Sequence, residues 1–353
     1  MAGFHGHTAS PDVRVLIREF GLGHVVLFAR NVDAPEQVAD LVRELQSIAR
    51  DAGHPDPLLV AVDQEGGRVA RLKQPWTVWP SQRIVGRAAS EDLARRRGAA
   101  LAAELGACGI RLDFAPVVDL DTNPNSPVIG DRSFGHDPEL VGRLGAALVR
   151  GLQENGVAAC AKHFIGQGDT DLDPHLELPA VHHPRPRLEE REMAPFRRAI
   201  EAGVSGIMTA HVLLTDLDPD LPATLSPRVV KELVRGALKF TGVVFSDDME
   251  MHAVAKRWKP SESAVLAARA GCDVIEYCAD HAQQADALEG LIRAVESEDI
   301  SWTDLDDSVE RVRRLKHQYL LPHRDPDPRR ARLAAGTGEG VAREIAARGG
   351  IQA

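Results

Sequence analysis

The stretch A-K-H-F-I-G-Q-G-D-T-D-L-D-P-H-L-E-L-P, from Ala161 to Pro179, starts with the end of an apolar run and continues as a loop with two glycines. The small and apolar residues before Lys162 predict a buried strand. Loops fixed to a rigid scaffold are where catalytic groups collect. The stretch therefore predicts a strand that leads into a functional site. The titratable residues it holds are Lys162, His163, Asp169, Asp171, Asp173 and His175.

Comparable apolar runs recur along the chain and alternate with helical patterns. In the first helix, Asp33 can act as a cap, Pro35 suits an early helical position, and an apolar stripe recurs at helical spacing. Alternating strands and helices predict a parallel sheet covered on both faces. The predicted strands are Val25 to Phe28, Leu58 to Val62, Ile110 to Val118, Val157 to Ala161, Val204 to Met208, Val243 to Phe245 and Val274 to Tyr277, and the predicted helices are Pro35 to Ala49, Glu91 to Leu105, Leu188 to Ile200, Pro227 to Leu238 and Glu262 to Ala270.

The number of strands favours a closed barrel. These runs, with a short degenerate first strand near Gly3 to Gly6, make eight strands in a chain of 353 residues. We therefore expect a single (β/α)8 TIM-type barrel rather than an open doubly wound sheet. The barrel is assigned to residues 1–321 and ends after a helix at Trp302 to Tyr319. Residues 322–353 are expected to form a Pro/Arg-rich linker and a C-terminal helix without a second domain, because Pro322 to Pro328 cannot continue a helix.

Composition and charge exclude several classes of protein. An apolar content of 44 % is enough for a sizeable core. The formal charge of −10 is spread without a basic cluster, so we expect no nucleic-acid partner. The chain has no apolar run long enough to span a membrane, and Met1 to Ser10 lacks the features of a secretory signal. We expect a cytoplasmic protein whose 4 cysteines are buried free thiols, since no C-x-x-C spacing occurs.

Polar side chains gather where the predicted strands end. Active sites of barrels of this kind lie at the C-terminal ends of the strands. We therefore expect the polar groups that follow different strands to meet in space. Besides Lys162 and His163, these groups include Asp63, Gln64, Glu65, Arg68, Arg71, Asp119, Asp121, Asn123, Asp131, Arg132, Thr209, His211, Ser246, Asp247 and Asp248.

The same residues lie in motifs that resemble the family 3 glycoside hydrolases, specifically the bacterial β-N-acetylglucosaminidases (β-hexosaminidases) of the cell-wall recycling type. The resemblance covers nearly the whole predicted barrel, and the motifs follow the family's order. They are L-F-A-R-N-V at Leu27 to Val32, V-D-Q-E-G-G-R-V-A-R at Val62 to Arg71, F-A-P-V-V-D at Phe114 to Asp119, N-P-N-S-P-V-I-G-D-R-S-F at Asn123 to Phe134, K-H-F at Lys162 to Phe164 and F-S-D-D-M at Phe245 to Met249.

The resemblance implies a retaining exo-β-N-acetylglucosaminidase that hydrolyses terminal β-linked N-acetylhexosamine from peptidoglycan fragments through a covalent glycosyl-enzyme. It makes Asp247 the nucleophile, His175 the general acid/base and Asp173 the partner of that histidine. An imidazole with a pKa of about 6.5 can give and take a proton near neutral pH. A carboxylate two positions away in an extended loop can fix its tautomer. In the family the sugar hydroxyls are bound by the residues that match Asp63, Arg71, Arg132, Lys162 and His163, and His211 is a further candidate.

The predicted catalytic loop departs from the family pattern at three positions. The usual run is K-H-F-P-G-H-G-D followed by D-S-H, whereas this chain has Ile165, Gln167 and Pro174 in place of the proline, the second histidine and the serine. Pro174 restricts Asp173 to extended conformations. We expect these changes to affect substrate preference and rate more than the fold.

Two other motif-like patterns in this loop are set aside. Asp169 to Asp173 imitates the start of a calcium loop, but Pro174 and Ala180 stand where that loop needs glycine and glutamate. Gly166 to Gly168 lacks the third glycine and the helix of a dinucleotide-binding loop. We expect neither a metal nor another cofactor.

Two alternatives to hydrolysis remain open. A histidine acid/base adds no fixed negative charge against an incoming phosphate dianion, so one alternative is a phosphorylase of β-N-acetylglucosaminides or β-glucosides, or another β-glycosidase of the same family. The other is a non-catalytic sugar-binding barrel in which the altered loop no longer performs chemistry. In each case the expected partner is a small carbohydrate, and for the hydrolase it is a muropeptide fragment.

Overall fold

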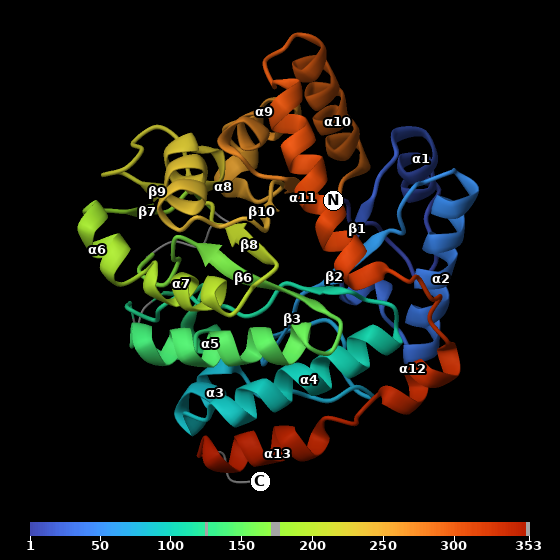
Figure 1. Ribbon diagram of the computed structural model, residues 1–353, viewed down its shortest axis with the longest axis vertical. Coiled ribbons are helices and arrows are strands. Elements are labelled where there is room, and N and C mark those ends of the chain that lie inside the picture. Colours follow the sequence, from blue (N-terminus) through green and yellow to red (C-terminus); the bar gives the residue numbers. More distant parts are fainter. Residues whose placement is uncertain (124–125, 171–176, 351–353) are drawn as a thin grey trace.

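A curled sheet of seven parallel strands forms the centre of the molecule (Figure 1). The structure is a computed structural model that describes residues 1–123, 126–170 and 177–350. The strand order is β1-β2-β5-β6-β8-β10-β11, so neighbours in the sheet follow one another along the chain. The alternation of strands and helices therefore predicted the sheet correctly. The strands are β1 (His24–Leu27), β2 (Leu59–Val62), β5 (Leu112–Asp113), β6 (Ala158–Phe164), β8 (Gly206–Thr209), β10 (Val243–Asp248) and β11 (Val274–Glu276).

The two edge strands of this sheet are joined through Ala2. Ala2 forms parallel bridges to Val25 of β1 and to Tyr277, which follows β11. The amide of Gly3 also donates to the carbonyl oxygen of Tyr277 at 3.0 Å. Ala2 thus supplies the degenerate first strand, and the predicted (β/α)8 barrel is confirmed. This strand lies before the expected Gly3 to Gly6, because Gly6 has a φ of 97° that interrupts extended backbone.

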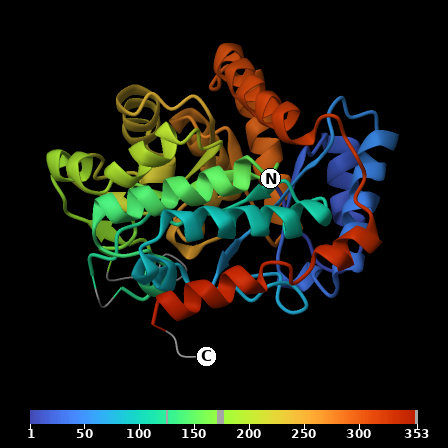
Figure 2. The same ribbon diagram turned by 60° about the horizontal axis from the view of Figure 1, so that its bottom comes forward.

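Helices surround the barrel, and α4 and α5 lie side by side on its outside (Figures 1 and 2). Four of the predicted helices are confirmed to within two residues at each end: α2, α4, α9 and α11. The segment predicted as one helix at Leu188 to Ile200 forms two helices separated by a turn. The helices are α1 (Pro11–Phe20), α2 (Pro35–Asp51), α3 (Gln82–Ala88), α4 (Glu91–Ala107), α5 (Pro138–Gln153), α6 (Arg185–Glu190), α7 (Ala194–Glu201), a π-helix (Arg228–Ala237), α8 (His252–Ala255), α9 (Pro260–Ala270), α10 (His281–Glu296) and α11 (Trp302–Leu320).

Helix α2 shows how the local sequence determines an element. Pro35 occupies its first turn, where the missing amide costs no hydrogen bond. The N-cap is Ala34 rather than the predicted Asp33, and it makes no side-chain cap. The backbone amide of Asp33 donates a hydrogen bond to Oε1 of Gln37 at 2.9 Å. The predicted apolar stripe is buried against the sheet and includes Val38, Leu41, Val42, Leu45 and Ile48.

Two further helices follow α11 and pack on the outside of the barrel (Figure 2). Helix α12 (Pro328–Ala334) contacts α2 and α4, and α13 (Glu339–Arg348) contacts α3 and α4. Ile345 of α13 is fully buried, so this helix is docked on the barrel. The division of the chain at residue 321 stays a prediction.

Apolar side chains form two layers, one inside the barrel and one between the sheet and the helices. The inner layer includes Val26 of β1, Phe245 of β10 and Phe114, which directly follows β5. All four cysteines are buried and free, as predicted. Within the described ranges, no helix is long and apolar enough to cross a membrane.

Candidate functional site

Lys162, near the C-terminal end of β6, forms ion pairs with Asp63 and Glu65, which follow β2. Its Nζ lies 2.6 Å from Oδ1 of Asp63 and 2.7 Å from Oε1 of Glu65, and its side chain is only 2 % exposed. Burial lowers the pKa of Lys162, but the two carboxylates outweigh burial and hold the pKa above its ordinary value. The site therefore contains a charged ammonium enclosed by two carboxylates.

Arg132 holds the second of these carboxylates in a fork. Its Nε lies 2.9 Å from Oε2 of Glu65, and its Nη2 lies 2.8 Å from Oε1. Burial raises the pKa of Glu65, but Arg132 and Lys162 outweigh burial and keep the pKa far below its ordinary value. Glu65 therefore stays ionised. Because two parallel charged hydrogen bonds fix direction as well as distance, Glu65 orients Arg132.

Asp63 and Arg71 form the part of this cluster that solvent and a ligand can reach. Their side chains are 15 % and 27 % exposed, and Nη2 of Arg71 lies 3.3 Å from Oδ2 of Asp63. Burial raises the pKa of Asp63, but the charges of Lys162 and Arg71 outweigh burial, so the pKa lies below its ordinary value. The result is an ionised acceptor beside a cationic donor.

His163 is held by a buried aspartate at the end of the neighbouring strand. Its Nδ1 lies 2.8 Å from Oδ2 of Asp119, and its Nε2 lies 3.4 Å from Nη2 of Arg132. Since an aspartate accepts and an arginine donates, these partners assign the proton to Nδ1 and an acceptor role to Nε2. The other oxygen of Asp119 accepts from the amide of Gln167 at 2.8 Å. Asp119 thus fixes both the imidazole and the start of the loop.

The predicted dyad of Asp173 and His175 lies outside the described residues. The chain on both sides of residues 171–176 is anchored at the C-terminal end of the barrel. On the near side, Oγ1 of Thr170 donates to the carbonyl oxygen of Gln167 at 2.8 Å. On the far side, the short strand β7 (Ala180–Val181) pairs with β9 (Leu213–Leu214). The predicted loop therefore starts and ends beside β6 and β8.

Asp247 and Asp248 end strand β10. Val243 and Phe245 pack in the barrel interior, and the register of β10 against β11 shifts between Phe245 and Asp248. Asp248 is part of the local scaffold, because its Oδ1 accepts from the amide of Glu250 at 3.1 Å. Burial raises the pKa of Asp248 to about 7.

His211 is fully buried after β8. Its Nδ1 lies 2.9 Å from Oγ1 of Thr224, and its Nε2 lies 3.0 Å from the carbonyl oxygen of Asp248. Both ring nitrogens are thus used within the protein. His211 joins the end of β8 to the end of β10.

Two carboxylates of the site, Glu65 and Glu276, were given no role from the sequence; Glu65 was expected among the polar groups at the strand ends, and Glu276 was not singled out. Glu276 lies on β11, is 3 % exposed, and its Oε1 has no partner among the residues that the structure describes. Burial raises the pKa of Glu276 well above its ordinary value, and the charges of Asp63 and Asp247 contribute. The charge of Asp248 acts in the same direction. A glutamate inside the apolar run V-I-E-Y-C was the available signal.

The assembled groups are suited to binding a polyhydroxylated ligand. Fixed carboxylates, guanidinium groups and an imidazole present both donors and acceptors, and buried partners hold them in place. A site of this kind discriminates by hydrogen bonds to hydroxyl groups. In the described part of the chain, no group of three or more His, Cys, Asp or Glu residues is arranged to hold a metal ion.

Comparison with known proteins identifies a family over most of the chain. Residues 6–315 match the N-terminal domain of glycosyl hydrolase family 3. A β-hexosaminidase from Nitrosomonas eutropha is 38 % identical over 297 residues, which cover 82 % of this chain and 83 % of that protein. A β-hexosaminidase from Alkalilimnicola ehrlichii is 40 % identical over 284 residues, which cover 79 % of this chain and 80 % of that protein.

Solved structures with the same fold agree with this result. A family 3 β-N-acetylglucosaminidase from Paenibacillus superposes with a TM-score of 0.91 and 42 % identity, over 99 % of this chain and 67 % of that one. NagZ from Neisseria gonorrhoeae, in complex with N-trifluoroacetyl-D-glucosamine, superposes with a TM-score of 0.81 and 30 % identity, over 99 % and 97 % of the two chains. The likeness therefore covers the barrel and its site.

Proposed function

We propose that this chain, which belongs to glycosyl hydrolase family 3, is a retaining exo-β-N-acetylglucosaminidase that hydrolyses terminal β-linked N-acetylhexosamine. Membership of the family confirms the resemblance seen in the motifs. The observation that carries the proposal is the position of Asp247 at the end of β10, at the same end of the barrel as the buried cluster of Asp63, Glu65 and Lys162. The β-hexosaminidase relatives support the choice of sugar.

In the proposed mechanism Asp247 attacks the anomeric carbon and forms the glycosyl-enzyme. A retaining glycosidase needs a nucleophile on one side of the bond and a proton donor on the other. Asp247 is assigned as the nucleophile because it is the first aspartate of the S-D-D motif that ends β10. Asp248, which supports the turn to Glu250, is engaged in the scaffold and is not assigned this role.

His175 is proposed to protonate the leaving oxygen and then to take a proton from the water that releases the sugar. Asp173 would keep the imidazole in one tautomer and stabilise its charged form. Both residues lie outside the described ranges, so this assignment rests on the D-x-H motif. The anchored segments on either side, at Gln167 and at β7, support it, because they start and end the loop beside the strands that carry the site.

Sugar hydroxyls are proposed to bind to Asp63, Arg71 and Arg132, whose side chains keep some exposure. Lys162 and His163 lie deeper, where they bind hydroxyls that reach the floor of the site and orient the outer groups. His211 is proposed to line the site only as a support, because it holds the end of β10. The Neisseria relative binds a glucosamine with a substituted amide, which fits a 2-acetamido sugar as substrate.

The test is turnover of aryl β-N-acetylglucosaminides by the full chain and by two matched variants. Asp247→Asn should lower kcat by several powers of ten, because the nucleophile is lost, whereas Asp248→Asn should retain most of the activity. Trapping with a slowly hydrolysed fluoro-sugar should label a peptide that contains Asp247. His175→Ala should lower kcat most for aryl groups that leave poorly, because general acid catalysis matters least for a good leaving group.

Other outcomes separate the alternatives. Sugar phosphate as the product in phosphate buffer would favour a phosphorylase over a hydrolase. Sugar binding that survives Asp247→Asn, with no turnover by the intact chain, would favour a non-catalytic barrel. Muropeptides as natural substrates and a cytoplasmic location stay predictions, and the pattern of accepted muropeptide fragments would test the first of them.

A further inference from the structure

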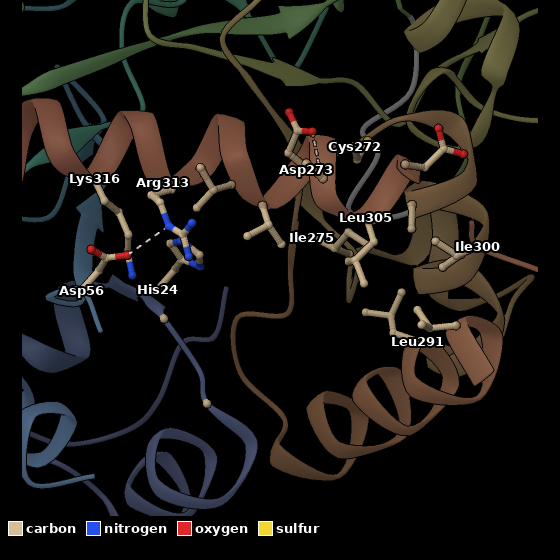
Figure 3. Close-up of a pocket in the computed structure, with 18 of the residues that line it drawn as sticks. His24, Asp56, Cys272, Asp273, Ile275, Leu291, Ile300, Leu305, Arg313 and Lys316 are labelled. Atoms are coloured by element: carbon tan, nitrogen blue, oxygen red, sulfur yellow. Dashed lines mark hydrogen bonds and ion pairs between the residues drawn. The ribbon is translucent and has the colours of Figure 1, made fainter. Parts of the chain in front are cut away.

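A second pocket lies at the opposite end of the barrel from the proposed catalytic site. It has a volume of about 380 Å³ and is lined by the residues that precede strands β1, β2 and β11, together with helices α10 and α11. This volume falls within the range of roughly 300–1,000 Å³ that is typical of small-molecule sites. Figure 3 shows Lys316, Arg313 and Asp56 beside His24 at one end of the pocket, with Leu305, Ile300 and Leu291 further along it.

Lys316 is a buried cation in this pocket, and the charge of Asp56 acts on it without forming an ion pair. It is 7 % exposed, and in the described part of the chain its ammonium has neither an ion pair nor a side-chain hydrogen bond. Burial lowers the pKa of Lys316 to about 8, although Asp56 opposes the shift. Burial also lowers the pKa of the adjacent His24 well below its ordinary value, so this imidazole is neutral at pH 7. Its Nε2 has no partner among the described residues.

The acidic side chains that line the pocket already have other partners. Buried charges are normally paired, and an unpaired one is costly. Lys316 therefore shares Asp56 with Arg313 and His317 and has no carboxylate of its own. The existing pairs are Asp56 with His317 at 2.9 Å and Arg313 at 3.8 Å, Asp273 with Arg311 at 2.9 Å and with Arg235, and Asp304 with Lys231 at 3.6 Å.

Beyond the charged end, the pocket continues as an apolar groove beside α11. Lys316 and Leu305 are eleven residues apart on this helix, which corresponds to about 16 Å at a rise of 1.5 Å per residue. A neighbouring pocket of about 280 Å³ shares Gly23, His24, Ile275 and Leu291 with it. The apolar side chains of the groove are Ile275, Leu291, Val295, Ile300, Leu305 and Val309.

We propose that this pocket binds a small carboxylate that carries an unbranched apolar chain. The carboxylate pairs with Lys316, and the chain lies along the groove towards Leu305 and Ile300. A single unpaired ammonium matches one monovalent anion. The long apolar wall excludes a short, fully hydrated anion as the preferred ligand, because only an apolar chain gains free energy by leaving water there. The site is separate from the proposed glycosidase reaction and does not depend on it.

Titration calorimetry with decanoate at pH 7, on the full chain, tests the proposal. We expect saturable binding at one site. Lys316→Met keeps the unbranched apolar stem but removes the ammonium, so it should weaken decanoate binding about tenfold or more. Lys239→Met, which removes an exposed lysine before β10, should bind decanoate as the native chain does. Circular dichroism melting curves of both variants check that they are folded.

Two further comparisons separate the head group from the chain. Decylammonium and decanol have the same chain without the carboxylate, and both should bind at least about tenfold more weakly than decanoate. Leu305→Gln should weaken decanoate binding through the chain, while leaving Lys316 in place. The proposal is wrong if the native chain does not bind decanoate, if folded Lys316→Met binds it as tightly as the native chain, or if decanol binds as tightly as decanoate.

Discussion

Asp119 holds His163 through one carboxylate oxygen, with Oδ2 of the aspartate 2.8 Å from Nδ1 of the imidazole. The amide of His163 donates to the same oxygen at 3.1 Å, while the other oxygen accepts from Gln167. One buried side chain therefore fixes the end of β6 and the first residues of the proposed catalytic loop.

Asp119→Asn is expected to loosen both of these connections. An amide has one acceptor oxygen in place of two, so at least one buried donor loses its partner, at a cost of about 1–3 kcal/mol in the free energy of unfolding. Urea unfolding measures this loss. Because the loop leads to His175, kcat should fall more for poorly leaving aryl groups than for good ones. Asp137→Asn, at the N-cap of α5 where both residues cap equally well, is the control and should change neither quantity. An equal fall in kcat for all leaving groups would argue against this link to the loop.

Lys162→Met should destabilise the fold as well as remove activity. The substitution leaves the carboxylates of Asp63 and Glu65 without their shared ammonium, and loss of one partner from a buried charge cluster costs about 3–5 kcal/mol. Chemical denaturation of the native chain and the variant measures the difference. Lys231→Met is the control, because Lys231 forms an exposed pair with Asp304 that is worth little. A loss for Lys162→Met as small as that of the control would contradict the role given to this network.

Asp113 makes part of the stability depend on pH. It is fully buried on β5, where burial raises its pKa to about 7 while the amide of Gln64 opposes the shift. Between about pH 4 and pH 7 the folded chain keeps this proton while the unfolded chain has released it, so the free energy of unfolding should fall as the pH rises through that window. Asp113→Asn cannot ionise and should lose less stability between pH 5 and pH 8. Urea midpoints at the two pH values provide the measurement, and identical changes in both proteins would count against the shift.

Gly168 is required by close contact between two backbone segments. A Cβ at this position would lie 1.5 Å from the carbonyl oxygen of Leu120. Gly168→Ala should therefore displace the loop, lower the free energy of unfolding by about 1–3 kcal/mol and reduce kcat. Gly340→Ala in α13 is the matched control, since a Cβ there meets nothing within 4 Å and helix propensity should raise stability by about 0.5–1 kcal/mol. Thermal unfolding should show a lower stability for Gly168→Ala and a higher stability for Gly340→Ala. An unchanged stability of Gly168→Ala would contradict the close contact.

Much of the barrel could be predicted because its strands are short apolar runs followed by polar residues. The strand at Ile110 to Val118 was predicted too long, since only β5 pairs regularly and Pro116 has no amide to donate. Helix α5 was not predicted, because three glycines dilute its helical signal. Glycine is needed where α4 and α5 touch. A Cβ on Gly151 of α5 would lie 2.1 Å from the carbonyl oxygen of Arg95, and a Cβ on Gly98 of α4 would lie 2.6 Å from the carbonyl oxygen of Leu148. These glycines serve helix packing rather than helix propensity.

The site was predictable only where a motif marked it. Asp63 and Lys162 lie in recognisable runs, and the structure brings them together at 2.6 Å. Glu276 could not be assigned from the sequence, because a single acidic residue in an apolar strand does not reveal whether it faces the interior or the helices. That orientation depends on the register of β11 against β10.

The link through Ala2 also has a consequence for the order in which this protein folds. Ala2 pairs with Val25 nearby in the chain and with Tyr277, which lies 275 positions after Ala2. The second pairing carries a large loop-closure entropy and can form only after β11 has been synthesised. The barrel therefore closes late in folding. Until then, the backbone groups at the end of β11 that will pair with Ala2 can form hydrogen bonds with water or with another chain.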